Sequence, residues 1–177
     1  MKINTYEFPT SSFLSLEKDA ALIVQRLLKN DRFKKLLYYT DKHCLKNVKD
    51  FPNLTDEQTI SLINKNILIE TDLLIESEIA NRVLLTFDNF TVNENNTEYR
   101  DNLIYFDIIC NDSQINLGDF QLRPYKIAGE IDSMLNGQRL TGIGKIEFVG
   151  AQKMRWSDRF SGMTLIYRTV HGSEDKK

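Results

Sequence analysis

Apolar residues recur three or four positions apart between residues 15 and 40, which is the spacing of a buried helix face. The stretch TSSFLSLEKDAALIVQRLLKN therefore predicts an amphipathic helix, with Ser15 as its N-cap. Its apolar stripe consists of Ala20, Ile23, Val24, Leu27 and Leu28. A second short helix is predicted in DRFKKLLYYT, where Phe33, Leu36 and Leu37 share a face.

The polar stretch 41–54 predicts a connection, and a short helix is expected after it. In TDEQ, Gln58 follows Thr55 by three residues, which is the pattern of a capping box at a helix N-terminus. The apolar residues of this helix are Ile60, Leu62 and Ile63. The following ILIETDLLIESEIA is compatible with a strand, a loop or a helix, so its structure stays open.

From Arg82 the apolar pattern changes to a period of two, as in strands. NRVLLTFDNFTV and DNLIYFDIIC are rich in β-branched and aromatic residues, and the turn-rich ENNTEYR separates them. In the second run one face carries Ile104, Phe106, Ile108 and Cys110, while the other carries Leu103, Tyr105, Ile109 and Asp107. A strand that is apolar on both faces must be covered on both, by a helix, another sheet or another subunit.

LRPYKIAGEIDSMLNG, residues 122–137, predicts one amphipathic helix. Pro124 suits its first turn, and Gly137 suits the position after its last turn. We expect Arg123 to anchor the start of this helix by bonding nearby carbonyls or a carboxylate. The predicted buried stripe is Tyr125, Ala128, Ile131 and Leu135, joined by Ile127 and Met134, and the predicted exposed side is Lys126, Glu130 and Asp132.

A final hairpin is predicted from GIGKIEFVGAQ, a loop KMRWSDRFS and GMTLIYRTV. Two hairpins with a helix between them predict an α+β fold, in which this helix and the N-terminal helices pack on an antiparallel sheet. We expect a single domain, 1–177, made of an N-terminal arm (1–14), helices (15–40), a connecting segment with a short helix (41–81), a hairpin–helix–hairpin core (82–170) and a flexible tail (171–177).

The formal net charge of −2 argues against a protein that mainly coats nucleic acid, because phosphate binding needs a basic surplus. No apolar run approaches the roughly 20 residues needed to cross a bilayer, and MKINTYEFPT lacks the apolar core of a signal peptide. Cys44 and Cys110 are far apart in the sequence, which favours reduced thiols in an intracellular setting over a disulfide framework.

Motifs for catalysis or metal binding are weak. The adjacent His43 and Cys44 lack the spacing of a zinc site, and Cys110 ends an apolar strand, where a thiol is expected to be buried and unreactive. GIGK differs from a phosphate-binding loop in its spacing and in the isoleucine after its lysine. The acidic run Glu70, Asp72, Glu76 and Glu78 indicates a solvated or subunit-facing segment. We therefore expect no catalytic residues, no cofactor and no metal.

Basic and aromatic residues interleave in KMRWSDRF, which contains Lys153, Arg155, Trp156, Arg159 and Phe160. This mixture is typical of protein-interface hot spots and also of surfaces that bind single-stranded nucleic acid. The negative net charge of the chain favours the protein interface.

The order of N-terminal helix, long hairpin, amphipathic helix and second hairpin resembles the tail terminator, or tail-completion, proteins of tailed bacteriophages. FDNFTVNENNTEYRDNLIYFDIIC, LRPYKIAGEIDSMLN, and GIGKIEFVGAQ followed by GMTLIYRTV carry the resemblance. LLKNDRFKKLLYYTDKH is also similar to the opening of small phage neck and tail proteins. The match lies in the order of the elements and in their residue patterns rather than in an invariant motif.

The resemblance implies a structural virion protein of the tail or neck, assembled in the host cytoplasm, that forms a six-fold ring at the capsid-proximal end of the tail. Such a ring caps the tail tube and joins it to the neck, and genomic DNA passes through its lumen without specific binding. Its implied partners are further copies of itself, the tail tube and the head-completion or connector proteins, with no membrane contact. The alternatives are another head–tail connector, neck or baseplate protein, and then a nucleic-acid-binding protein or a small enzyme.

A ring joins unlike surfaces of neighbouring subunits. The doubly apolar strand around Tyr105 and the aromatic–basic loop around Trp156 are expected to supply two such surfaces. The residues expected at subunit or partner interfaces are Tyr105, Arg123, Tyr125, Lys126, Glu130, Arg155, Trp156 and Arg159.

Overall fold

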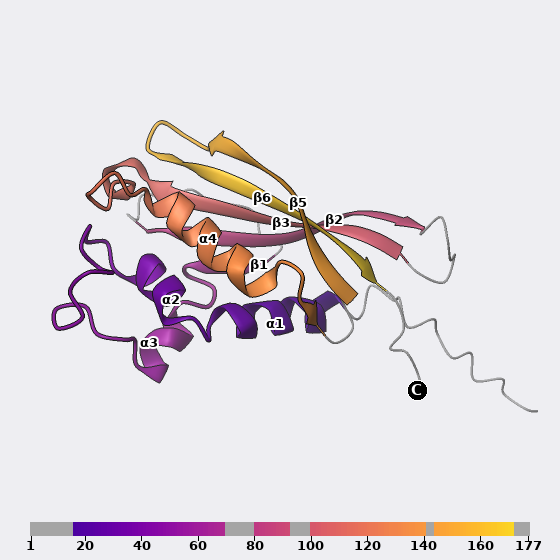
Figure 1. Ribbon diagram of the computed structural model, residues 1–177, viewed down its shortest axis with the longest axis horizontal. Coiled ribbons are helices and arrows are strands. Elements are labelled where there is room, and N and C mark those ends of the chain that lie inside the picture. Colours follow the sequence, from indigo (N-terminus) through magenta and orange to yellow (C-terminus); the bar gives the residue numbers. More distant parts are fainter. Residues whose placement is uncertain (1–15, 70–79, 93–99, 141–143, 172–177) are drawn as a thin grey trace, which may run out of the picture.

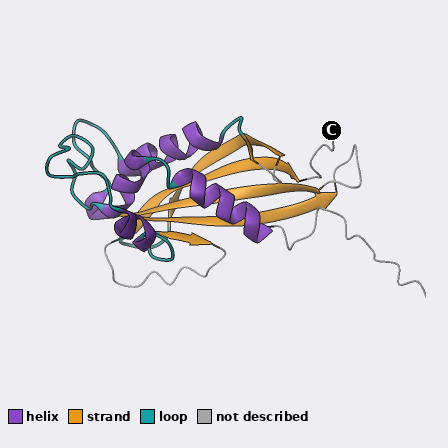
Figure 2. Cartoon of the chain, turned by 90° about the horizontal axis from the view of Figure 1, so that it is seen from below, coloured by secondary structure: helices purple, strands orange, loops and turns teal. Residues whose placement is uncertain are grey.

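The computed structural model describes residues 16–69, 80–92, 100–140 and 144–171. Within these ranges the chain forms an α+β fold in which four α-helices accompany a six-stranded sheet curled into a half-barrel (Figure 2). All four helices lie on the same side of the sheet (Figure 1). The predicted fold class is therefore confirmed.

The helices are α1 (Leu16–Leu27), α2 (Asp31–Tyr38), α3 (Asp56–Ser61) and α4 (Arg123–Leu135), and the strands are β1 (Ile67–Ile69), β2 (Arg82–Val92), β3 (Arg100–Asn111), β4 (Arg139–Leu140), β5 (Gly144–Arg155) and β6 (Phe160–His171). The predicted hairpins are β2–β3 and β5–β6, and they join because β3 pairs with β6 in antiparallel register. The strand order is β1-β2-β3-β6-β5-β4. The β1–β2 pairing is parallel, so the sheet is mixed rather than purely antiparallel.

The two N-terminal helices form as the apolar spacing predicts. Within α1 the residues that repeat at helical spacing are buried, while α2 buries Phe33, Leu36 and Leu37. The side chain of Asn30 caps α2 by accepting hydrogen bonds from the backbone amides of Arg32 and Phe33.

Helix α3 begins with the predicted capping box. The Thr55 hydroxyl accepts from the Gln58 amide, and the Gln58 side chain accepts from the Thr55 amide in return. Its apolar residues divide differently from the expectation, because Leu62 is buried while Ile60 and Ile63 are exposed. None of the six residues of this helix is buried, and the buried Leu62 is its C-cap residue.

Helix α4 buries a stripe that repeats every four residues, from Arg123 through Ile127 and Ile131 to Leu135. Tyr125 was expected in this stripe, and that expectation is wrong because its side chain is 58% exposed. In the first turn the buried position of this stripe is taken by Arg123, although arginine is almost never fully buried unless it is paired. The helix ends as predicted, with Gly137 in the left-handed region at φ 74°.

The side of α4 that was expected to face solvent instead makes contacts within the subunit. The Glu130 carboxylate accepts hydrogen bonds from the Asn30 amide group and the Arg32 guanidinium, both at 2.8 Å. Asp132 accepts a hydrogen bond of 3.1 Å from the Tyr167 hydroxyl on β6. The helix is therefore sandwiched, with β3, β5 and β6 on one side and α1 and α2 on the other.

The second hairpin is longer than the sequence suggested. β5 continues to Arg155 and β6 starts at Phe160, so most of the expected loop KMRWSDRFS is strand. The turn closes through a hydrogen bond of 3.0 Å from the Trp156 amide to the Phe160 carbonyl. Each hairpin also shifts register once, after Asp88 in β2 and after Phe148 in β5, and such bulges increase the local twist of the outer strands.

The core lies between the sheet and the helices. From the sheet it contains one side of β3 as predicted, the matching side chains of β2 and β6, Ile67 of β1 and Ile146 of β5. The set is Ile67, Val83, Leu85, Phe87, Ile104, Phe106, Ile108, Cys110, Ile146, Leu165 and Tyr167. From α4 it contains Ile127, Ala128, Ile131 and Leu135. The rings of Phe106 and Tyr167 meet edge to face at 5.8 Å.

Arg123 is fully buried in this core. Its guanidinium donates at 2.7–3.1 Å to the main-chain carbonyls of Leu36, Tyr39, Thr40, Asp41 and Gln114. Four of these carbonyls belong to the end of α2 and the residues after it, where helix carbonyls lack partners and carry partial negative charge. The expectation that Arg123 anchors the start of α4 is confirmed, with carbonyls in place of a carboxylate.

Several expectations fall outside the described residues: the arm 1–14, Ser15 as an N-cap, the acidic run Glu70, Asp72, Glu76 and Glu78, the turn at 93–99, Gly142 and the tail from residue 172 onward.

Candidate interaction surfaces

The side of the sheet away from the helices, called the outer face below, carries the second apolar side of β3. Tyr105 lies at its centre, in register with Thr86 on β2 and Ile166 on β6. Leu103, Tyr105 and Ile166 are each half-buried. Among the described residues no helix lies over this face (Figure 1).

Charged side chains border this apolar centre on one side. In the row beside Leu103, Glu147 accepts from Lys145 at 2.9 Å and from Arg168 at 3.2 Å. The hydrogen bond from Lys145, followed by the one from Arg168, lowers the pKa of the Glu147 carboxyl below its usual value. On the other side of the apolar centre, the Thr164 hydroxyl donates to the Asp107 carboxylate. An apolar centre with a polar border is the usual anatomy of a protein interface.

Trp156 lies against Gly162 near the hairpin turn. A Cβ atom on Gly162 would lie 3.3 Å from the indole ring and 1.9 Å from the carbonyl oxygen of Ile108, so only glycine fits there. Strand alternation places Trp156 on the same side of the sheet as Tyr105. Both residues therefore lie on the outer face, and their expected roles in two unlike subunit contacts stay a prediction.

The structure separates the remaining interface candidates. Arg155 and Arg159 are exposed near the hairpin turn, where Arg155 lies 3.8 Å from the Asp112 carboxylate. Lys126 is half-buried on α4, Glu130 is bound to α2, and Arg123 has no exposed surface. The eight candidates therefore do not form one patch.

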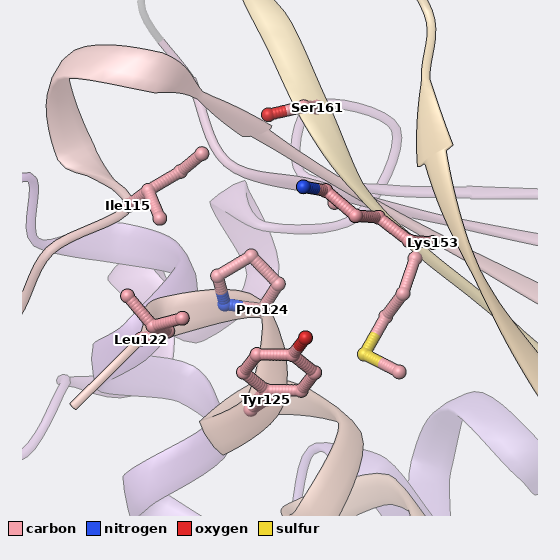
Figure 3. Close-up of a pocket in the computed structure, with 8 residues that line it drawn as sticks. Ile115, Leu122, Pro124, Tyr125, Lys153 and Ser161 are labelled. Atoms are coloured by element: carbon pink, nitrogen blue, oxygen red, sulfur yellow. The ribbon is translucent and has the colours of Figure 1, made fainter. Parts of the chain in front are cut away.

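A cavity of about 130 Å³ opens between the start of α4 and the hairpin β5–β6 (Figure 3). It is lined by Ile115, Leu122, Pro124, Tyr125, Lys153, Ser161, Gly162 and Met163. The Lys153 amine extends above Pro124, and the Tyr125 phenol points toward the same space (Figure 3). The Ser161 hydroxyl at its edge donates to Asp112 at 2.6 Å.

Sequence reasoning missed an exposed aromatic residue in the loop that leads into α4 and into the cavity residue Leu122. Phe120 is fully exposed, two residues before Leu122. The only local signal was the pair Gly118–Asp119, which is typical of a turn. A phenylalanine is ordinarily counted as core, so apolar periodicity alone could not place it outside.

The chemistry available in the described residues is limited. Burial raises the pKa of the Cys110 thiol to about 12, against a smaller lowering by Arg123, so this thiol is not an activated nucleophile. Cys44 is also buried, and burial raises its pKa. Within the described ranges no three His, Cys, Asp or Glu side chains gather as a metal site would require. No helix there is long and apolar enough to cross a membrane.

Comparison with curated proteins gives no match for the chain. A family model does match residues 30–169, a range that extends from the N-cap of α2 to Thr169 in β6 and so contains the cavity and the outer face. The chain belongs to the YomW family.

Proposed function

We propose that this protein is a structural virion protein of a tailed phage, a tail terminator that forms a ring at the capsid-proximal end of the tail. In that position it caps the tail tube and joins it to the neck. The ring has six copies, and DNA passes through its lumen.

The observation that carries the proposal is the outer face of the sheet. Leu103, Tyr105 and Ile166 gather there in adjacent rows, half-buried, with no helix above them in the described part of the chain. Half-buried aromatic and aliphatic side chains bordered by charged pairs are typical of a subunit contact. A contact through this face needs a different surface on the neighbour, because a ring closes by heterologous contacts.

The family supports a phage context, because YomW is the name of a phage gene product of the SPBc2 type. The chemistry of the described residues also favours a structural role, since the thiol of Cys110 is buried and protonated. A net charge of −2 suits a lumen that lets DNA slide without holding it.

The proposal is tested by the mass and shape of the full-length protein in solution. Light scattering over a concentration series, followed by negative-stain imaging, is expected to give closed rings of six times the 20.6 kDa of the chain. Tyr105→Arg is expected to abolish the rings, because it places an unpaired charge in the contact. Tyr38→Arg, an exposed tyrosine on α2, is the matched control and should still assemble.

Circular dichroism of both variants separates loss of assembly from loss of folding. A second assay adds the protein to purified tail tubes and images their ends. The proposal is overturned if the wild-type protein stays monomeric at every concentration and also leaves the tube ends uncapped.

A further inference from the structure

The loop before α4 holds Phe120 in an unfavourable position. Three consecutive residues, Gly118, Asp119 and Phe120, have positive φ angles of 80°, 49° and 59°. Glycine adopts this region freely and aspartate tolerates it, so the strain falls mainly on Phe120. The phenyl ring is also fully exposed, so it contributes none of the free energy that burial of such a ring would give.

The backbone of this loop is nevertheless held by hydrogen bonds between residues 116 and 122. Leu117 donates to Gln121 and Gln121 donates to the Gly118 carbonyl, both at 2.9 Å. An antiparallel bridge joins Asn116 to Leu122, and Lys46 pairs with the Asp119 carboxylate. The ring is thus displayed by a defined backbone rather than by a loose segment. Strained backbone is found most often at binding and catalytic sites.

The cavity beside this loop combines an apolar floor with one cation. Its aliphatic and proline side chains are Ile115, Leu122, Pro124 and Met163. The Lys153 amine reaches over this floor, and the phenol of Tyr125 points the same way (Figure 3). No carboxylate within the described residues forms an ion pair with Lys153. Leu122 and Tyr125 line the cavity and are exposed, and the exposed Phe120 lies two residues before Leu122 in the loop that the Asn116–Leu122 bridge closes.

We propose that the cavity is a docking site for a segment of a different protein chain, in which an apolar side chain is followed by a carboxylate. The apolar side chain fills the cavity below Lys153, and the carboxylate pairs with its amine. Phe120 covers the segment from the side, which removes its ring from water. The charge of Lys153, with the exposed Arg159 nearby, favours an acidic occupant over a basic one, whereas Arg155 already faces the Asp112 carboxylate.

The choice of a different protein rests on the proposed function, in which the outer face of the sheet contacts a second copy. The cavity lies on the helix side of the sheet, since Met163 pairs with the core residue Ile108. A second copy can therefore contact the outer face while a different chain occupies the cavity. A tail tube or neck component is the kind of partner that would reach it.

Methionine labelled with ¹³C at its methyl group gives a direct readout, because the chain has four methionines and Met163 lines the cavity. The probe is the capped peptide acetyl-Gly-Phe-Glu-Gly-amide, and its matched control is acetyl-Gly-Phe-Lys-Gly-amide. Titration of the full chain is expected to shift the Met163 methyl signal with the Glu peptide. The Lys peptide should bind at least tenfold more weakly.

Two variants test the residues that carry the site. Lys153→Glu is expected to reverse the preference between the two peptides, while Lys18→Glu, an exposed lysine on α1, leaves it unchanged. Phe120→Ala should weaken the Glu peptide at least fivefold, whereas Ile60→Ala, another exposed apolar residue, should not. Unchanged affinity in both Lys153→Glu and Phe120→Ala would overturn the proposal.

Other occupants give different results. If inorganic phosphate alone shifts the Met163 signal and competes with the peptide, the site is an anion site and the proposal fails. If Phe120→Ala lowers the mass of a wild-type oligomer, the occupant is a second copy, which also overturns it. Rings with no peptide binding would reject only this inference, while peptide binding without rings or tube capping would reject only the proposed function.

Discussion

The guanidinium of Arg123 donates a hydrogen bond of 2.7 Å to the main-chain carbonyl of Leu36, a residue 87 positions earlier in the chain. The same side chain bonds three carbonyls that follow α2 and the carbonyl of Gln114. One buried cation therefore joins the end of α2 to the start of α4. No carboxylate takes part, and its acceptors are five main-chain carbonyls together with the Cys44 Sγ at 3.8 Å.

Replacing Arg123 by methionine should destabilise the protein by about 3 kcal/mol or more, because several buried carbonyls lose their donors together. Arg123→Lys should also be strongly destabilising, since an ammonium group has three donors and cannot reproduce the planar guanidinium. Urea denaturation followed by circular dichroism measures both. The exposed Arg155→Met is the control and should change the free energy of unfolding by less than about 0.5 kcal/mol. An Arg123→Met variant as stable as this control would contradict the assignment.

The hydrogen bond between Tyr167 and Asp132 should respond unequally to the loss of either partner. Tyr167→Phe removes only the hydroxyl, and the half-exposed Asp132 can turn to water, so a loss of about 0.5–1.5 kcal/mol is expected. Asp132→Ala leaves the hydroxyl of a buried tyrosine without its partner and should cost more, about 1–3 kcal/mol. In a double-mutant cycle, adding Tyr167→Phe to Asp132→Ala should then cause little further loss. Simple additivity of the two losses would show that the bond contributes nothing.

Gly162 should not tolerate a side chain. A Cβ atom would lie 1.9 Å from the Ile108 carbonyl oxygen, which is backbone in the centre of the sheet and cannot move easily. Gly162→Ala is therefore expected to lower the free energy of unfolding by at least about 2 kcal/mol. Gly150→Ala on the adjacent strand β5 meets nothing within 4 Å and is the matched control, with an expected change below about 1 kcal/mol. Thermal unfolding by calorimetry distinguishes the two, and equal losses would argue against the close contact.

The elements that could be predicted are those whose cause is local in the sequence. The capping box of Thr55 and Gln58 involves residues three positions apart, and both hairpins follow from a period of two. The stripe of α1 is likewise a local repeat. These patterns specify which side of each element is apolar, and the core between helices and sheet follows from that.

The features that could not be predicted depend on distant backbone. Arg123 was expected to anchor the start of α4 and to lie at an interface, but its full burial could not be predicted because its acceptors come mainly from residues 36–41. Tyr125 was assigned to the core although it lines a cavity that exists only once α4 meets the hairpin β5–β6. Phe120 is exposed because the bridge between Asn116 and Leu122 closes its loop. The candidate docking site combines Tyr125 of α4, the loop of Phe120 and Lys153 of β5, so no single stretch of sequence signals it.

Cys110 should make the stability of the protein depend on alkaline pH. Burial raises the pKa of its thiol from 9.0 to about 12 in the folded state. Because the folded pKa lies above the unfolded one, the stabilisation is complete below pH 9 and is lost as the pH rises toward 12, by up to about 1.4 kcal/mol per pH unit. Cys110→Ala lacks this titration, although it leaves a small cavity and is less stable at neutral pH.

The free energy of unfolding of the wild type and of Cys110→Ala is therefore to be compared in urea at pH 7.5, 9.0 and 10.5. The advantage of the wild type should stay constant up to about pH 9 and then shrink by about 2 kcal/mol by pH 10.5. Cys44 and Tyr167, whose pKa values are also raised by burial in the folded protein, are present in both proteins, so their contributions cancel in the difference. A difference that stays constant across the whole range would mean that the thiolate of Cys110 is tolerated in the core, in contradiction to its burial.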